Sequence, residues 1–145
     1  MRPVNLTDIP FIIACLQKLR IESPIYAECA DDPVYVTETL TAMIQSEGFL
    51  GVIVEGKGFM IGMVSAQWYS SIQNAYEQLI YVLPEHRKSS AAYRLVTGFI
   101  DAAYAYGAAF AYAGASTGLD HEGTFRMYER LGFERFGTGV RKELL

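Results

Sequence analysis

The segment 82–92 combines residue types that can bind a phosphate group. It leads out of an apolar stretch, turns, and opens a new stretch of helical periodicity, with Arg87, Lys88, Ser89 and Ser90 at the junction. The first N–H groups of a helix have no partner within the helix and form an anion site, to which basic residues add charge and serines add hydroxyl donors. The segment is therefore predicted to bind a phosphate or pyrophosphate. A serine-capped helix preceded by two solvated basic residues is the alternative.

Two helices are expected to precede the strands. Thr7 and Asp8 are the expected caps of the first, in which apolar residues recur at helical spacing over 9–19. Asp32 followed by Pro33 begins the second, which is expected to stop at Gly48. The two helices should pack side by side.

The central part of the chain predicts an antiparallel meander. Runs 49–55 and 59–69 are strand-like and are split by the turn-forming residues 56–58, which indicates a hairpin. A polar link, 70–74, then leads to a third strand, 75–82, which ends before Pro84.

The remaining chain predicts a strand–helix–strand crossover. A long helix over 92–106 is closed by Gly107 and followed by a short strand, 108–113, which must lie parallel to the strand before the helix. A last short helix begins at Asp120 or Thr124 and runs to Arg130. The chain is expected to end in a hairpin formed by 133–136 and 140–144. The fold class is α/β with a mixed sheet, in a single domain over residues 1–145.

Composition excludes several other classes of protein. The net charge is −4 and the basic residues are scattered, which argues against a nucleic-acid partner. Cys15 and Cys29 form no disulfide framework, and no His or Cys cluster has metal-ligand spacing, so no metal is expected. The N-terminus has no signal-peptide pattern, and no apolar run is long enough for a membrane span. A soluble, cytoplasmic protein is expected.

The order of elements resembles that of the GNAT superfamily of N-acyltransferases over nearly the whole chain. Segment 82–92 resembles the cofactor loop of that family, Gln/Arg-x-x-Gly-x-Gly/Ala, with Arg87 and Ala92 at matching positions. Ser90 stands where the family usually has its first glycine. Serine adopts a positive φ less readily than glycine, so that conformation would cost more energy here. The serine side chain also leaves less space for the phosphates to approach the backbone.

Segment 121–133 resembles a second family signature, Asn-x-x-Ala-x-x-x-Tyr-Glu-Lys-x-Gly-Phe. His121 and Thr124 replace the usual Asn and Ala. The matching positions are Tyr128, Glu129, Arg130, Gly132 and Phe133. The family Asn helps to hold the cofactor's arm, so His121 changes that contact.

The resemblance implies direct transfer of an acetyl group from acetyl-CoA to a primary amine in a ternary complex. Tyr128 would be the general acid that protonates the leaving thiolate, and Glu77 is the candidate base. Family bases on this strand often lie one residue away, where Tyr76 occurs here, and such an offset turns the side chain to the other face unless a bulge intervenes. A core tyrosine and a solvated strand carboxylate are the alternatives for these two residues.

The resemblance assigns the binding residues by position. Backbone groups at the end of the third strand would pair with the pantetheine arm, and the loop and the last helix would contact the rest of the cofactor. These cofactor-binding residues are Leu79, Ile80, Tyr81, Val82, Arg87, Lys88, Ser89, Ser90, Ala91, Ala92 and His121. The acceptor pocket would include Glu22, Tyr26 and Glu28, which follow the first helix; solvated loop carboxylates are the alternative for the two glutamates.

The sequence leaves the acceptor open between a small-molecule amine and a peptide amine. A noncatalytic coenzyme A-binding or small-molecule-sensing module is the alternative function, because Ser90, His121 and the register of Glu77 depart from the family pattern. A homodimer interface is an open possibility for the final hairpin and the surplus of aromatic residues.

Overall fold

The first third of the chain is helical. The computed structural model describes residues 1–137 and 139–144. Helix α1 (Ile9–Glu22) is followed directly by the short α2 (Pro24–Ala27), and α3 is Pro33–Ile44. The side chain of Ser23 caps α2 and that of Asp32 caps α3, each followed by a proline in the first turn. The two predicted helices are thus confirmed, and α2 is an addition.

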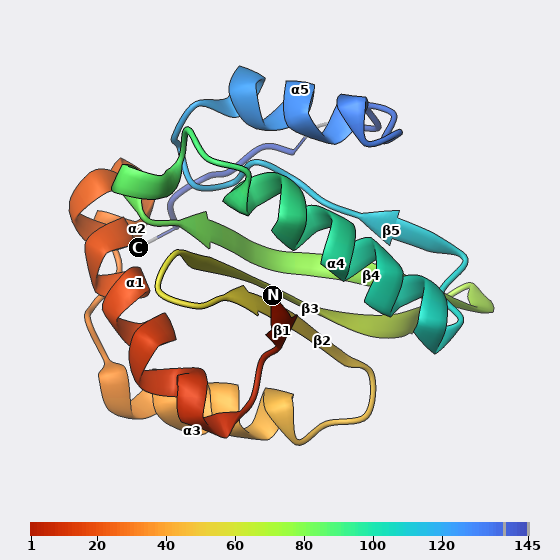
Figure 1. Ribbon diagram of the computed structural model, residues 1–145, viewed down its shortest axis with the longest axis horizontal. Coiled ribbons are helices and arrows are strands. Elements are labelled where there is room, and N and C mark those ends of the chain that lie inside the picture. Colours follow the sequence, from red (N-terminus) through yellow and green to blue (C-terminus); the bar gives the residue numbers. More distant parts are fainter. Residues whose placement is uncertain (138, 145) are drawn as a thin grey trace.

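Five strands form one mixed sheet in the order β1-β2-β3-β4-β5. They are β1 (Arg2–Pro3), β2 (Phe49–Val54), β3 (Gly58–Gln67), β4 (Ser70–Val82) and β5 (Phe110–Tyr112). The first four strands pair antiparallel, and β5 lies parallel to β4, as the crossover predicted. Figure 1 shows β5 at the edge of the sheet, beneath α5.

The connecting helices differ in length. The 3-10 helix η1 (Leu6–Asp8) precedes α1, and η2 (Pro84–His86) follows β4. Helix α4 (Ala91–Tyr106) ends at Gly107, which has a φ of 99°, a left-handed conformation that glycine adopts without strain. Helix α5 (His121–Arg130) completes the regular structure.

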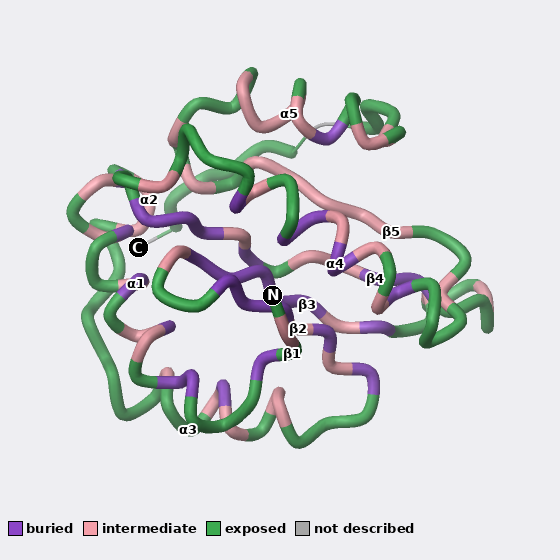
Figure 2. Tube along the Cα trace, in the orientation of Figure 1, coloured by how far each residue is buried: buried purple, intermediate pink, exposed green. Residues whose placement is uncertain are grey.

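Helices cover both faces of the sheet, so there are two apolar cores. Helices α1 and α3 pack with alternate strand residues on one face, and α4 with Tyr128 of α5 packs on the other. Figure 2 shows the buried positions concentrated in the central strands and on the inner side of α4. The most deeply buried large side chains come from both cores: Phe59, Ile12, Leu19 and Ile53 from the first, and Phe99, Met60, Leu95 and Val96 from the second.

A β-bulge interrupts the pairing of β3 with β4. Ile61 pairs with Leu79, whereas the next residue, Gly62, pairs with Glu77, so β4 carries one extra residue. A Cβ at Gly62 would lie 2.2 Å from the carbonyl oxygen of Tyr76, which explains the glycine opposite the bulge. The bulge reverses the facing of β4, because Ala75 packs on the α4 side while Leu79 packs on the α1 side.

Two expectations about the strands are wrong. The predicted polar link 70–74 is part of β4, because β3 and β4 are joined by a tight turn between Gln67 and Ser70. The predicted closing hairpin, 133–136 and 140–144, contains no strand in the described residues. Its charged residues pair with helices instead of alternating across a sheet: Arg135 binds Glu122 and Glu129 of α5.

Among the described residues, no helix is both long and apolar enough to cross a membrane.

Candidate active site

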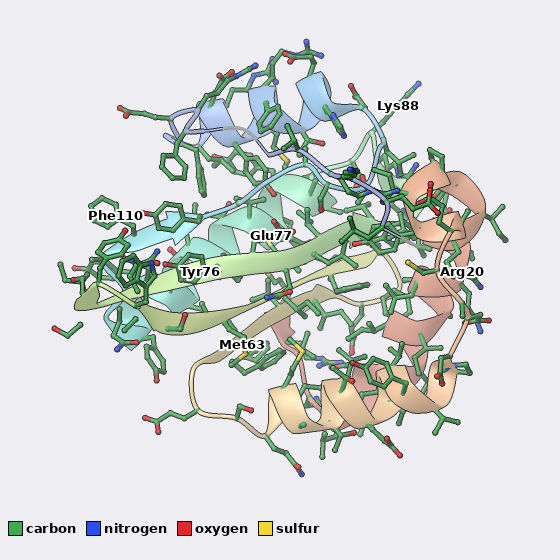
Figure 3. All side chains as sticks on the ribbon, turned by 180° about the vertical axis from the view of Figure 1, so that it is seen from behind. Arg20, Met63, Tyr76, Glu77, Lys88 and Phe110 are labelled. Carbon is green, nitrogen blue, oxygen red and sulfur yellow. The ribbon has the colours of Figure 1, made fainter. Side chains whose placement is uncertain are left out.

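A cavity opens where β5 separates from β4. The two strands pair only from Asn74 to Tyr76, and beyond this point the chain after β5 diverges from β4. The cavity is small, about 40 Å³. It is lined by Glu77, Leu79 and Ile80 of β4, by Gly114, Ala115, Ser116 and Thr117 after β5, and by Thr124 of α5. Figure 3 shows Glu77 midway along β4, between the helical layers.

Glu77 is a carboxylate without a cationic partner. Its Oε2 accepts a hydrogen bond from the amide of Gly114 at 3.1 Å. No ion pair to it occurs within 1–137 and 139–144. Burial raises the pKa of Glu77, and the backbone hydrogen bonds offset only part of that shift. A carboxylate with a raised pKa is a better proton acceptor than an ordinary surface glutamate.

Tyr128 places a phenol in the buried layer between α5 and the sheet. Its side chain is 3% exposed and packs against Phe133, with the ring centroids 5.1 Å apart. The hydroxyl has no hydrogen-bond partner among the described groups. Burial raises the pKa of Tyr128, and the nearby charge of Glu77 raises it further. The phenol therefore keeps its proton at neutral pH, and no group within 1–137 and 139–144 accepts a hydrogen bond from it.

Tyr26 lies on the α1 side of the same region. Burial raises the pKa of its half-buried phenol and Glu77 adds to the shift, while a hydrogen bond with Ser116 lowers it. The hydroxyl of Ser23 donates to the carbonyl of Thr117, which ties the start of α2 to the cavity wall. Tyr26 thus lies behind Ser116 of the cavity wall and is not among the residues that line the cavity.

The start of α4 leaves backbone donors free. Ser89 Oγ accepts from the amide of Ala91 at 3.2 Å, but the N–H groups of Ala92 and Tyr93 have no partner among the residues described. Ser90 has a φ of −74°, so the serine is accommodated without the positive φ expected to cost energy, and its side chain makes no capping hydrogen bond. Lys88 is exposed and projects outward (Figure 3).

Arg87 and Glu22, predicted to face different ligands, bind each other. Arg87 Nη1 and Nη2 donate to the two carboxylate oxygens of Glu22 at 2.7 and 2.8 Å. Tyr81 also donates its hydroxyl to Glu22, at 2.6 Å. Glu28 likewise forms an ion pair, with Arg141. The structure therefore brings Glu77, Tyr128 and Tyr26 together and pairs both predicted acceptor-site glutamates with arginines.

The other predicted positions are spread along β4 and α5. Leu79 and Ile80 line the cavity, whereas the side chains of Tyr81 and Val82 are buried in the two cores. His121 is exposed at the first position of α5 and does not line the cavity.

The sequence profile described as the acetyltransferase (GNAT) family matches residues 15–133. The chain belongs to this family. The match spans the second half of α1, all of α3, the meander, the segment 82–92 and the Tyr128 segment, and it confirms the resemblance seen in the sequence. Acetyl transfer is the general activity that membership supports, and acetyl-CoA is the usual donor in the family.

Solved structures share the GNAT fold at low sequence identity. A putative acetyltransferase from Agrobacterium tumefaciens matches with a TM-score of 0.76 and 15% identity, covering 99% of this chain and 98% of the other. An aminoglycoside acetyltransferase from an uncultured soil metagenomic sample, in complex with sisomicin, matches at 0.72 and 16%, covering 99% and 95%. A transcriptional regulator from Bacillus halodurans matches at 0.79 and 15%, covering 99% and 97%. No curated protein matches the sequence.

The GNAT site also contains residues that the sequence analysis missed. Gly114, Ser116, Thr117 and Thr124 line the cavity, and Gly114 supplies the amide that holds Glu77. The available signal was the run of small residues 113–118 directly after the expected parallel strand, since small side chains at that place leave room beside β4.

Proposed function

We propose that the protein transfers an acetyl group from acetyl-CoA to a primary amine by direct attack in a ternary complex. Glu77 is the proposed base and Tyr128 the proposed acid. One observation carries the proposal. Among the residues that the structure describes, a half-buried carboxylate without a cation and a buried phenol without a hydrogen-bond partner lie close enough for the charge of one to raise the pKa of the other. Such a pair is typical of acid–base sites.

The residues present suit a coenzyme A thioester. The free amides of Ala92 and Tyr93, with the hydroxyl of Ser90 and the charge of Lys88, would hold the pyrophosphate at the start of α4. Beyond Tyr76, β4 has no paired strand on its outer side, which leaves backbone groups for an amide-bearing arm. When bound, acetyl-CoA supplies the thioester carbonyl that an amine attacks.

Glu77 and Tyr128 would move the two protons that the reaction requires. An alkylammonium has a pKa of about 10.4 and cannot attack until it loses a proton. Glu77 accepts that proton, directly or through a water, and its raised pKa narrows the mismatch with the amine. Tyr128 gives its hydroxyl proton to the departing sulfur, a step typically worth ~10²–10⁴-fold in rate.

The charges around the cavity favour a small acceptor with one reacting amine. Glu22 and Glu28 are each neutralised by an arginine, so neither offers a free carboxylate to a second ammonium group. Glu77 is the carboxylate that lines the cavity. Sisomicin, the polycationic ligand in the structure of the aminoglycoside acetyltransferase, would gain no more electrostatic attraction from the charges around this cavity than a monoamine would.

Mass spectrometry of reaction mixtures tests the proposal. The purified protein is incubated with acetyl-CoA and a panel of primary amines, including monoamines, polyamines, sisomicin and short peptides, and a mass gain on a monoamine is expected. Binding of acetyl-CoA is measured in parallel by calorimetry and by the shift in melting temperature. Binding without turnover of any amine would favour the noncatalytic coenzyme A-binding module, and absence of binding would remove the cofactor assignment.

A charge reversal tests the cofactor loop. Ser90→Glu puts a carboxylate beside the free amides of α4 and is expected to abolish acetyl-CoA binding while leaving the melting temperature of the free protein unchanged. Ser71→Glu is the matched control, because Ser71 is exposed near the β3–β4 turn. Equal affinity of the Ser90→Glu variant and the parent would place the pyrophosphate elsewhere.

A further inference from the structure

Arg87 is partly exposed, yet the protein itself binds each nitrogen of its guanidinium. Besides its two bonds to Glu22, its Nε donates to the carbonyl of Val82 at 3.0 Å. The guanidinium also lies over the ring of Tyr81, 5.4 Å from the centroid. All three nitrogens are thus engaged, and the two that form the fork are matched to both carboxylate oxygens in the strongest geometry available to arginine.

The ion pair joins three segments that surround the proposed site. Glu22 is the last residue of α1, immediately before the α2 turn that carries Tyr26. Val82 is the last residue of β4, and Arg87 directly follows η2 and leads to the free amides of α4. A single guanidinium therefore holds the acceptor side, the strand that carries Glu77 and the cofactor loop against one another.

We propose that Glu22 and Arg87 act as positioning residues that hold the cofactor loop in its binding shape, and that Arg87 is not itself a ligand of the pyrophosphate. The inference rests on the proposed function and refines it. The phosphates are then bound by the amides of Ala92 and Tyr93, by Ser90 and by Lys88, which the ion pair leaves free. A preformed loop spares part of the ordering cost of binding.

The two possible roles of Arg87 predict opposite effects of one substitution. If Glu22 positions the loop through Arg87, Glu22→Gln weakens acetyl-CoA binding, by about 5-fold, which corresponds to about 1 kcal/mol. If Arg87 were a phosphate ligand held back by Glu22, the same variant would release the guanidinium, remove a nearby negative charge and bind acetyl-CoA more tightly. Calorimetry on the folded variant decides, and unchanged or tighter binding overturns the proposal.

A double-mutant cycle shows whether the two residues act as one unit. Arg87→Gln and Glu22→Gln each break the same contact, so the double variant is expected to bind acetyl-CoA no more weakly than the weaker single variant. Arg87→Lys keeps the charge but loses the fork, so it should weaken binding nearly as much as Arg87→Gln. Further loss in the double variant would show that the two residues act separately and would contradict the proposed unit. Full affinity in Arg87→Lys would assign a direct phosphate contact to Arg87.

A truncated donor separates loop positioning from general damage. S-acetyl-N-acetylcysteamine carries the thioester and one amide but no pyrophosphate, so Glu22→Gln should lower kcat/KM for acetyl-CoA by a larger factor than kcat/KM for the truncated donor. Equal losses with both donors would contradict the positioning role. Glu55→Gln is the control, because Glu55 also pairs with an arginine, Arg2, at the β1 edge of the sheet. Absence of acetyl-CoA binding by the parent would instead contradict the proposed function itself.

Discussion

Glu22 and Glu77 lie on opposite sides of the proposed site and have opposite surroundings. Glu22 accepts three hydrogen bonds from charged or phenolic donors, and the Arg87 guanidinium holds its pKa below the usual range. Glu77 accepts a hydrogen bond from the backbone amide of Gly114 but has no cationic partner among the described residues, and burial raises its pKa. One residue type is thus kept charged in one place and driven toward its neutral form in the other.

This difference separates a structural role for Glu22 from a catalytic role for Glu77. A carboxylate that already binds a guanidinium has its charge satisfied and gains little by accepting a proton, so Glu22 suits a structural contact. A half-buried carboxylate with no cation beside it accepts a proton more readily than a solvated one, so Glu77 suits a base. The predictions below test that division, beginning with the largest expected effect.

The largest effect is expected from Glu77→Gln. The amide cannot accept the amine's proton but keeps the size of the side chain, so kcat should fall by roughly 10²–10⁴-fold. Rates with the amine found by mass spectrometry are compared with the melting curve of the same variant. A fully active, well-folded Glu77→Gln protein would transfer the role of base to a water path or another group.

Tyr128→Phe should also reduce the rate, toward the lower part of the ~10²–10⁴-fold range, because a coenzyme thiol with a pKa near that of cysteine is a fairly good leaving group. The free energy of unfolding should be equal or slightly higher, since the buried hydroxyl has no hydrogen-bond partner in the described part of the chain. A fall in kcat and in kcat/KM together would mark an interaction made in the transition state.

An unchanged rate with Tyr128→Phe would make Tyr128 a core residue and end its role as the acid. A large drop in melting temperature would reveal a hidden partner of the hydroxyl.

Gly62→Ala should destabilise the bulge that directs Glu77 to the cavity. A Cβ there would meet the Tyr76 carbonyl oxygen at 2.2 Å and the Phe99 ring at 2.9 Å, and relief of such overlap typically costs about 1–3 kcal/mol. Gly139→Ala is the control, because a Cβ at Gly139 meets nothing within 4 Å. Denaturant unfolding of both variants measures the difference; equal stability would show that β4 adjusts its register freely.

Local sequence patterns predicted most of the fold. The Asp32 cap, the turn at 56–58 and the glycine stop at Gly107 were confirmed, because each depends on a few neighbouring residues. The closing hairpin was not formed, since alternating apolar residues cannot show whether a sheet edge is available to receive them. Phe136, an expected strand residue, is 78% exposed.

The contacts of the candidate site residues could not be predicted from the sequence. The alternation of apolar and polar residues could not locate the bulge that sets which face of the sheet Glu77 lies on. An extra residue in a strand is recognised only when the pairing with the neighbouring strand is known. The sequence pattern also could not predict the ion pair between Glu22 and Arg87. The two residues are far apart in the chain, and each one alone could bind a ligand. Long-range register and charge pairing come from packing, which short motifs do not encode.

The smallest expected effect is a pH-dependent difference in stability that has opposite sign at the two glutamates. The folded pKa of Glu22 is lowered, so its ion pair stabilises the fold above the unfolded value of about 4.3 and the contribution disappears as the pH falls. Glu22→Gln should therefore be less stable than the parent at pH 7, by on the order of 1 kcal/mol or less because Arg87 is partly exposed, and the gap should close as the pH falls through the lowered folded pKa.

Glu77→Gln should show the reverse. The folded pKa of Glu77 is raised, so the parent loses stability as the pH rises from about 4.3 through that higher value, whereas the amide does not titrate. The free energy of unfolding of Glu77→Gln should therefore increase relative to that of the parent between pH 4 and pH 7. Urea unfolding of both variants and the parent across this range measures the two slopes. If the stability differences of the two variants changed with pH in the same direction, the two carboxylates would have similar surroundings in solution. The distinction between a structural Glu22 and a catalytic Glu77 would then fail.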